Sequence, residues 1–145
     1  MIYIAEAGPK GRGVFAGKAL GPGERIERAP VIVIPQVQLQ YLEKTNLSNY
    51  TYSWGPEGSD AAIAAGFGCF YNHSYEPNAD YVKLVDLGFI DIVAIRSIRE
   101  NEEITVNYNG SPNDRTPIWF DGEGRGWFHA DGRRADSQGP RAGNE

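Results

Sequence analysis

Residues 66–78 are the most informative stretch of this sequence, and they read Gly-Phe-Gly-Cys-Phe-Tyr-Asn-His-Ser-Tyr-Glu-Pro-Asn. Polar residues and a proline here follow an aromatic segment, and polar groups in such a place must be hydrogen-bonded if they are buried. Taken alone, Asn72-His73-Ser74 is typical of a turn capped by asparagine and serine that carries a structural histidine. A catalytic or binding role for this segment therefore requires further residues from other parts of the chain.

Neither a metal site nor a nucleophile is well supported in this stretch. The only other histidine is His129, in a glycine-rich tail, and no carboxylates stand at recognisable ligand spacings from His73. Ser74 follows His73 directly, but its surroundings do not resemble the nucleophile elbow of a hydrolase. We therefore expect no metal and no serine nucleophile.

Two further segments, one on each side, stand out. Residues 8–13 read Gly-Pro-Lys-Gly-Arg-Gly, a turn in which missing side chains let a ligand approach the backbone closely. It differs from a phosphate-binding loop, because it lacks Gly-Lys-Ser/Thr and precedes the strand-like residues 14–16 rather than a helix. Residues 102–108 read Glu-Glu-Ile-Thr-Val-Asn-Tyr, an apolar strand that ends on Tyr108. Each segment alone is compatible with an ordinary hairpin turn or strand.

Between these segments the chain alternates short apolar runs with turn residues, which predicts a mainly β fold built on an antiparallel sheet. Residues 86–88 predict a hairpin between two of the strands. Residues 37–44 are the one helix candidate, and residues 61–65 read as a short helical turn or a buried segment. The predicted strands are residues 14–16, 31–34, 50–54, 81–85, 89–95 and 104–108.

Composition narrows the classes of function. The 145 residues suit one domain, and 14 basic against 19 acidic residues give a net charge of −5. This leaves no basic field for nucleic acid or anionic lipid. The single cysteine, Cys69, excludes a disulfide scaffold, and the longest aliphatic run, residues 31–34, is too short to span a membrane. We expect an intracellular protein, cytoplasmic or nuclear, that is neither secreted nor membrane-bound.

The composition changes near residue 121. Residues 121–145 hold six glycines and nine charged residues, with Trp127 and Phe128 as the only bulky apolar groups. We expect one domain over residues 1–120 and a tail of which at least the last dozen residues are disordered. Whether Trp127-Phe128-His129 folds over a ligand or stays disordered is open at this point.

The order of the three segments resembles the SET-domain protein lysine methyltransferases. The resemblance rests on residues 11–16, on Asn72-His73-Ser74 with Pro77-Asn78, and on residues 102–108, and it spans residues 4–120. It implies a β-clip-like fold of small antiparallel sheets with few short helices and a C-terminal pseudoknot, in which a strand passes under a loop. The chain looks like the compact, zinc-free type, because the cysteine clusters of many members are absent. Cys69 also replaces an arginine that is frequent in the family.

The resemblance implies an S-adenosylmethionine-dependent protein-lysine N-methyltransferase, with methyl transfer to a lysine amine. Asn72 would bind the amino group of the cofactor, backbone groups of His73 would meet its adenine, and Trp119, in a Pro-x-Trp-aromatic segment, would cover the adenine face. The glycine-rich turn would lie along the methionine part of the cofactor through Gly11, Arg12 and Gly13.

The same resemblance assigns residues around the transferred methyl group. Tyr108 matches the catalytic tyrosine, whose hydroxyl orients the amine and the sulfonium carbons. Tyr81, three residues after Asn78, matches a position that restricts how many methyl groups fit, although it could equally be a cross-strand packing residue. Tyr50 and Tyr52 would line the substrate channel with Tyr81. An aromatic channel would favour the neutral amine without a dedicated base.

Two other classes of function remain at this point. A SET-like module could bind a peptide or the cofactor without turnover, and an unrelated β-rich interaction domain would have no affinity for S-adenosylmethionine. If the chain is an enzyme, its substrate is a lysine-bearing protein, and the negative charge suits a basic one such as a histone tail or a ribosomal protein. Neither the target lysine nor the oligomeric state follows from the sequence.

Overall fold

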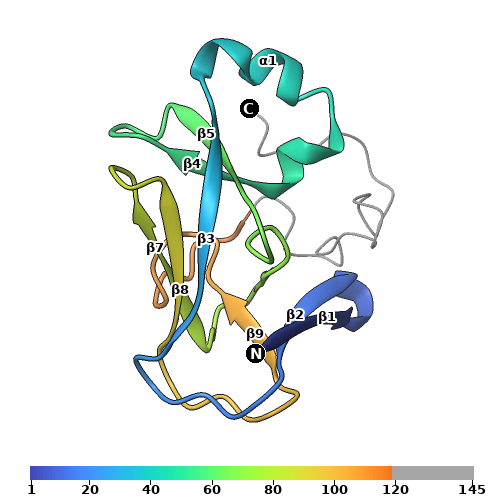
Figure 1. The fold of residues 1–145 in the computed structure, drawn as a ribbon. Helices are drawn as coiled ribbons and strands as arrows, with labels where there is room; N and C mark the ends of the chain where they lie inside the picture. The colour runs from blue at the N-terminus through green and yellow to red at the C-terminus, as the bar shows by residue number, and fades with distance from the viewer. Residues whose placement is uncertain (119–145) are drawn as a thin grey trace.

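A computed structural model describes residues 1–118, and this part of the chain is mainly β (Figure 1). The expected fold class is therefore confirmed, with one short α-helix and three 3-10 turns among the described residues. The helical elements are η1 (Gly8–Lys10), η2 (Gln36–Gln38), α1 (Leu39–Leu42) and η3 (Asn46–Tyr50). The strands are β1 (Ile2–Glu6), β2 (Arg12–Ala16), β3 (Arg25–Ile34), β4 (Thr51–Trp54), β5 (Asp60–Ala64), β6 (Asn72–His73), β7 (Ala79–Leu84), β8 (Phe89–Ala94) and β9 (Glu103–Val106).

The smaller sheet has the strand order β1-β2-β9-β6. The strands β1 and β2 form an antiparallel hairpin around η1, and β2 pairs antiparallel with β9. The two-residue strand β6 pairs with β9 in parallel, with Asn72 opposite Thr105 and His73 opposite Val106. A parallel pair needs a long crossover, and here residues 74–102 supply it. This pair is the exception to the antiparallel pairing expected from the sequence.

The larger sheet has the order β4-β5-β3-β8-β7, with β3 as its long central strand (Figure 1). The first half of β3 pairs with β8 and its second half, residues 31–34, pairs with β5. The two edge strands approach each other through their side chains: the rings of Tyr52 on β4 and Tyr81 on β7 meet edge-to-face at 5.1 Å. Because edge strands of a flat sheet would lie far apart, the sheet must curl.

The core lies between the sheets and is built from alternating strand residues. In β8 every second residue is buried, as the period of a strand with one covered face requires. Leu20 and Ile98 close one end through an isolated bridge. The largest apolar side chains with almost no exposure are Val14, Tyr71, Ile90, Ile92, Ile98, Ile104 and Val106.

The secondary structure departs from the sequence-based expectation in three places. Of the two alternatives for residues 61–65, the buried segment is confirmed and the helical turn is wrong: residues 60–64 form β5, because pairing with β3 and β4 overrides the helical preference of alanine. The helix expected over residues 37–44 is confined to α1 and the preceding 3-10 turn η2. Third, two strands were not predicted, β1 and β6. The division near residue 120 and the tail, including Trp119 and residues 127–129, lie outside the described residues.

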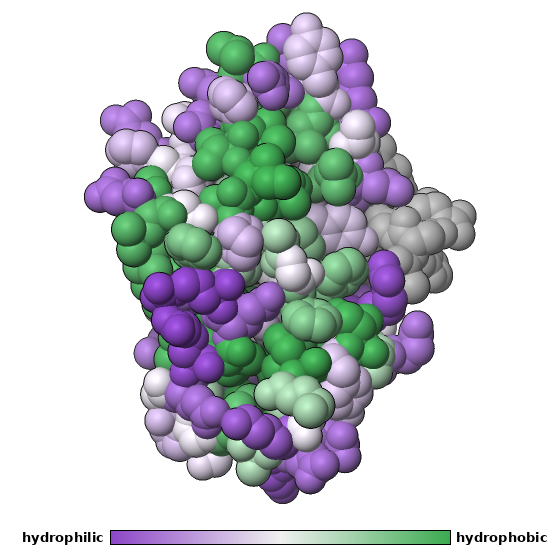
Figure 2. All heavy atoms as spheres, in the orientation of Figure 1, coloured by the Kyte–Doolittle hydropathy of each residue, from purple (hydrophilic) through white to green (hydrophobic). Residues whose placement is uncertain are grey.

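Apolar side chains also reach the surface. Figure 2 shows a group of them over the upper part of the face on which β3 runs towards α1. On β3, η2 and α1 the exposed large apolar side chains are Ile32, Val33, Val37 and Tyr41. None of the helices within residues 1–118 is long and apolar enough to cross a bilayer.

Candidate functional site

The parallel pairing of β6 with β9 places Asn72 and His73 beside the end of the strand that leads to Tyr108. Asn78, which is almost fully buried, secures this arrangement. Its Oδ1 accepts a hydrogen bond from the Thr105 backbone N–H at 2.9 Å, and its Nδ2 donates to the Glu103 carbonyl at 2.8 Å. The asparagine side chain therefore substitutes for a neighbouring strand and holds β9 in position.

Tyr108 is anchored at both its backbone and its hydroxyl. Its backbone N–H donates to Nδ1 of the buried His73 at 3.0 Å, and its hydroxyl donates to the Tyr71 carbonyl at 2.6 Å. The His73 ring also packs edge-to-face against Tyr75, with 4.3 Å between centroids. His73 thus supports Tyr108 through its side chain, in agreement with the structural histidine that the sequence favours for Asn72-His73-Ser74 taken alone.

The tyrosine hydroxyls of the site stay protonated at neutral pH. Tyr108 keeps 40% of its surface exposed, yet burial of its hydroxyl end raises its pKa, and the nearby Glu103 carboxylate adds to this. Burial raises the pKa of Tyr81 to about 12, with a further contribution from Asp80, and raises that of Tyr52 as well. These groups therefore serve as neutral hydrogen-bonding hydroxyls and not as phenolates.

The four tyrosines expected at the site line one cavity of about 450 Å³, which we call the tyrosine cavity. Tyr50 and Tyr52 come from η3 and β4, Tyr81 from β7, and Tyr108 from the segment after β9. The Tyr81 hydroxyl donates to the Tyr108 carbonyl at 3.3 Å. The remaining described residues of its wall are Ser48, Asn49, Thr51, Ser53, Gly68, Cys69, Tyr71, Lys83, Asn109, Pro117 and Ile118.

The segment after Tyr108 folds back to complete this wall. Asn109 donates through Nδ2 to the Thr116 carbonyl at 2.7 Å, and the Ile118 N–H donates to the Tyr75 hydroxyl at 3.1 Å. These bonds hold Pro117 at the cavity. The structure describes only the first half of the Pro-x-Trp-aromatic segment at residues 117–120. Pro117 and Ile118 line the tyrosine cavity, and Trp119 lies outside the described residues.

A second group of residues surrounds Gly13. Asn72 donates through Nδ2 to the Glu103 carboxylate at 2.7 Å and to the Arg12 carbonyl at 3.1 Å. The other Glu103 oxygen is paired with Lys10 at 2.6 Å, and both side chains are about four-fifths buried. A Cβ on Gly13 would lie 2.5 Å from the Glu103 carboxylate and 2.8 Å from Asn72 Nδ2. Any side chain at residue 13 would therefore displace the amide of Asn72 and the carboxylate of Glu103 from their present positions.

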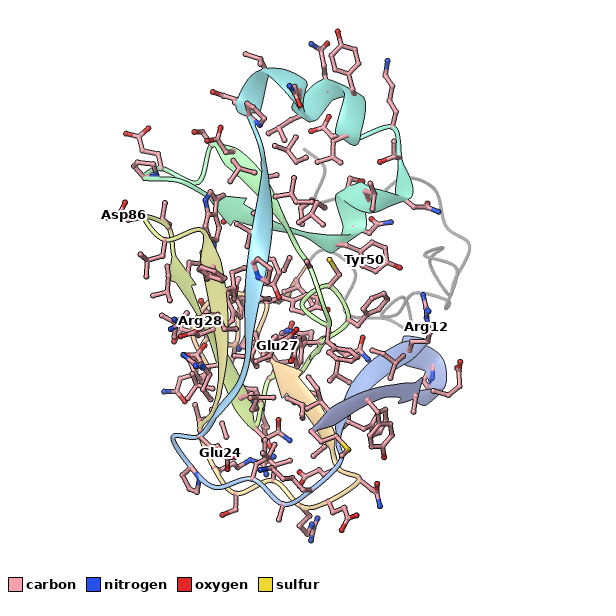
Figure 3. All side chains as sticks on the ribbon, viewed as in Figure 1. Arg12, Glu24, Glu27, Arg28, Tyr50 and Asp86 are labelled. Atoms are coloured by element: carbon pink, nitrogen blue, oxygen red, sulfur yellow. The ribbon has the colours of Figure 1, made fainter. Side chains whose placement is uncertain are left out.

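Arg12, whose carbonyl accepts the hydrogen bond from Asn72, also lines a second cavity of about 360 Å³, which we call the Arg12 cavity. Figure 3 shows Arg12 and Tyr50 on the same side of the molecule, and both line this cavity. The Arg12 guanidinium stacks on the Phe70 ring at 4.9 Å. The Arg12 cavity and the tyrosine cavity share Tyr50 and Cys69 as a common wall.

Cys69 and its neighbours lie between the two cavities and form part of the wall that the cavities share. The Cys69 thiol donates to the Ala64 carbonyl at 3.0 Å, and burial raises its pKa. Glu27 braces the same loop: one oxygen accepts from the Tyr71 hydroxyl at 2.8 Å, and the other accepts from the Phe67 N–H at 2.9 Å. Figure 3 shows Glu27 near the middle of the view, and its side chain is partly buried. These hydrogen bonds of Glu27 link residues 67–71 to β3.

Most of the residues expected at the site come together, and several others were missed. Gly11 has a positive φ of 82° at the turn before β2, so its glycine is required by the backbone. The missed members are Lys10, Glu27, Tyr71, Asn78, Lys83 and Glu103. Four of these residues, Lys10, Tyr71, Asn78 and Glu103, lie within the three segments quoted from the sequence. No sequence pattern distinguishes Glu27 or Lys83 from other residues of their type. No cluster of metal-ligating side chains occurs within residues 1–118.

Comparison with known proteins agrees with this architecture. Among solved structures, a candidate histone methyltransferase of Plasmodium falciparum gives a TM-score of 0.60 at 29% identity, over 77% of this chain and 99% of that chain. A humanized mutant of the Chaetomium thermophilum Polycomb Repressive Complex 2, bound to the inhibitor GSK126, gives a TM-score of 0.64 at 18% identity. That match covers 78% of this chain and 15% of the other, and it is a likeness of fold.

No protein with a curated description matches the chain. The family model of the SET domain matches residues 11–109, which is well over half of the sequence and includes the Gly13, Asn72 and Tyr108 positions. The chain therefore belongs to the SET-domain family.

Proposed function

We propose that this protein is an S-adenosylmethionine-dependent protein-lysine N-methyltransferase. The observation that carries the proposal is the pair of cavities that share Tyr50 and Cys69: one is lined by Arg12, whose carbonyl accepts a hydrogen bond from Asn72, and the other is lined by four tyrosines. A methyl transfer needs a donor and an acceptor that enter separately and meet. Two adjoining cavities with different linings meet that requirement.

The residues around Gly13 fit the charged end of S-adenosylmethionine. An amino acid moiety requires acceptors for its ammonium group and cations for its carboxylate. The Asn72 amide and the Glu103 carboxylate supply the acceptors, and Lys10 and Arg12 supply the cations. The Arg12 cavity has the size of a small-molecule site. In this proposal Gly11, Arg12, Gly13, Asn72 and His73 hold the cofactor, with Trp119 as a cover.

S-adenosylmethionine supplies, when bound, an electrophilic methyl group on a sulfonium. The tyrosine cavity would hold the lysine that receives it. A lysine amine in water has a pKa of about 10.4, so at neutral pH it must lose a proton before it can attack. Within residues 1–118 no carboxylate or imidazole lines the tyrosine cavity. The proton therefore leaves to water, and desolvation among the tyrosines favours the neutral amine.

Tyr108 is the catalytic residue of this proposal. Its hydroxyl proton is committed to the Tyr71 carbonyl, so its oxygen serves as an acceptor towards an amine or towards polarised C–H groups. Tyr81, whose hydroxyl is bound to the Tyr108 carbonyl, limits the space for methyl groups. Tyr50 and Tyr52 complete the substrate channel. All four side chains act by positioning and polarity in this proposal.

The test is transfer of a labelled methyl group from S-adenosylmethionine to lysine-containing peptides, with products identified by mass spectrometry. We expect methyl-lysine from the wild-type protein and a rate at least about a hundredfold lower from Tyr108→Phe. Tyr41→Phe, a change at an exposed tyrosine on α1, is the matched control and should leave the rate unchanged. Cofactor binding without transfer to any lysine would support the non-catalytic binding module instead.

A further inference from the structure

Lys83 is the one charged side chain among the described residues that line the tyrosine cavity. It stands two residues after Tyr81 on β7, so both side chains point to the same face of the strand. Tyr81 contacts Tyr108, and Lys83 lies one step further along β7. Its Nζ donates to the Ser53 hydroxyl on β4 at 3.0 Å and lies 5.9 Å from the Tyr81 ring. Lys83 thus joins the two edge strands beside the channel.

The charge of Lys83 is poorly compensated by its surroundings. The two contacts above are with a neutral hydroxyl and an aromatic ring, and no carboxylate in residues 1–118 forms an ion pair with it. Burial lowers the pKa of Lys83, and no neighbouring negative charge opposes this. A half-buried ammonium with a single neutral acceptor retains donors that a carboxylate can satisfy.

From this geometry we infer that Lys83 selects substrates in which an acidic residue stands two positions from the target lysine. The inference rests on the proposed function, because it assumes that the target lysine enters beside Tyr81 and Tyr108. Side chains on one face of an extended peptide recur about every 7 Å, which is also the spacing from Tyr81 to Lys83 along β7. A flanking carboxylate can therefore reach Nζ while the lysine occupies the channel.

The same contact disfavours a basic substrate segment. An arginine or lysine two positions from the target would face the Lys83 ammonium across a partly desolvated cavity, where like charges repel strongly. The net charge of −5 attracts basic partners in general, but salt screens that attraction beyond about 8 Å. At contact distance the charge of Lys83 determines which neighbouring side chain is favoured. Lys83 therefore favours a substrate other than the basic, histone-like tail expected from the net charge.

The experiment measures peptide binding by fluorescence anisotropy in the presence of S-adenosylhomocysteine, which prevents turnover. The peptides share one central lysine and carry glutamate, glutamine or arginine two positions from it. We expect the glutamate peptide to bind about fivefold more tightly than the glutamine peptide, and the arginine peptide to bind most weakly. The advantage of glutamate should shrink at about 1 M salt.

Charge variants assign the preference to one side chain. Lys83→Met keeps most of the apolar length and should remove the preference, and Lys83→Glu should reverse it towards arginine. Lys44→Glu changes the net charge by as much as Lys83→Glu does, but at an exposed residue outside the cavity. It should retain the wild-type order of peptide affinities. Circular dichroism of each variant checks that the fold is intact.

The outcomes separate this inference from the proposed function. Equal affinities, tighter binding of the arginine peptide, an unchanged order in Lys83→Met, or no binding of any peptide would overturn the role of Lys83. Methyl transfer that is fastest to the arginine peptide would do the same while leaving the methyltransferase assignment intact. A glutamate preference that depends on Lys83, without transfer to any peptide, would retain the inference and contradict the enzyme.

Discussion

Replacing Gly13 by alanine tests whether the backbone of β2 is pressed against the Asn72 and Glu103 pair. The added Cβ would lie 2.5 Å from the Glu103 carboxylate, 2.8 Å from Asn72 Nδ2 and 3.2 Å from the Ala7 Cβ. Carbon atoms do not approach polar atoms this closely, so the amide and carboxylate must move apart. The φ of Gly13 is not in the left-handed region, and the expected penalty is therefore steric and not conformational.

Overpacking of this kind costs about 1–3 kcal/mol of the free energy of unfolding. For a domain of this size that corresponds to a Tm lower by about 3–10 °C. Displacement of Asn72 should also weaken binding of S-adenosylmethionine about tenfold or more. Urea unfolding followed by circular dichroism measures the stability, and calorimetry measures the affinity.

The matched control is Gly21→Ala, where nothing lies within 4 Å of the added Cβ and no positive φ is present. Such a change should be neutral or slightly stabilising. A double-mutant cycle with Glu103→Ala adds a second check, because the clash with the carboxylate disappears and the two changes should couple by about 1 kcal/mol. If Gly13→Ala matches Gly21→Ala in both midpoint and affinity, the close approach at β2 has no energetic consequence and the reasoning fails.

Three other predictions follow from individual contacts. Asn78→Ala removes both bonds to β9 and leaves backbone groups of Thr105 and Glu103 unsatisfied, so the free energy of unfolding should fall by about 2–4 kcal/mol in urea titrations. An unchanged midpoint would mean that β9 is held by other contacts. The rate of methyl transfer should rise about tenfold per pH unit from about pH 7 to 9, because the amine must be neutral and the pKa of a lysine amine in water is about 10.4. No fall from tyrosine ionisation is expected there, since burial raises the pKa of Tyr81 to about 12 and raises that of Tyr108; a flat profile at saturating cofactor would exclude amine deprotonation as the limiting step. Tyr81→Phe removes the bond to the Tyr108 carbonyl and frees space, so mass spectrometry should detect a larger share of di- or trimethylated lysine, and an unchanged distribution would remove Tyr81 from that role.

The fold class and the segments around Gly13, Asn72 and Tyr108 were predictable because their signals are local. Turn residues and alternating apolar runs identify strands within a few residues of sequence. At residues 61–65 the expected buried segment is confirmed, but the helical alternative is wrong: a run of alanines favours a helix in isolation and forms β5 here because β3 and β4 flank it. The roles of Tyr81, Trp119 and the cofactor-binding residues remain predictions.

The contacts that shape the site were not predictable, because they join distant parts of the chain. Lys10 and Glu103 are separated by 93 residues, and Ser53 and Lys83 by 30. Their pairing depends on how the sheets close and on which edges meet, and neither is encoded in local periodicity. Glu27 was missed for the same reason, since its hydrogen bonds to Phe67 and Tyr71 exist only once β3 crosses the centre of the larger sheet.

The most direct test of the proposed cofactor site is calorimetric titration of S-adenosylmethionine into the wild-type protein, Asn72→Ala and Tyr108→Phe. We expect saturable one-to-one binding by the wild type, loss of binding in Asn72→Ala, and retained binding in Tyr108→Phe. Thermal melts of the three proteins check that the variants are folded. No binding by the folded wild-type protein up to millimolar cofactor, or equal binding by wild type and Asn72→Ala, would contradict the cofactor site proposed beside Gly13.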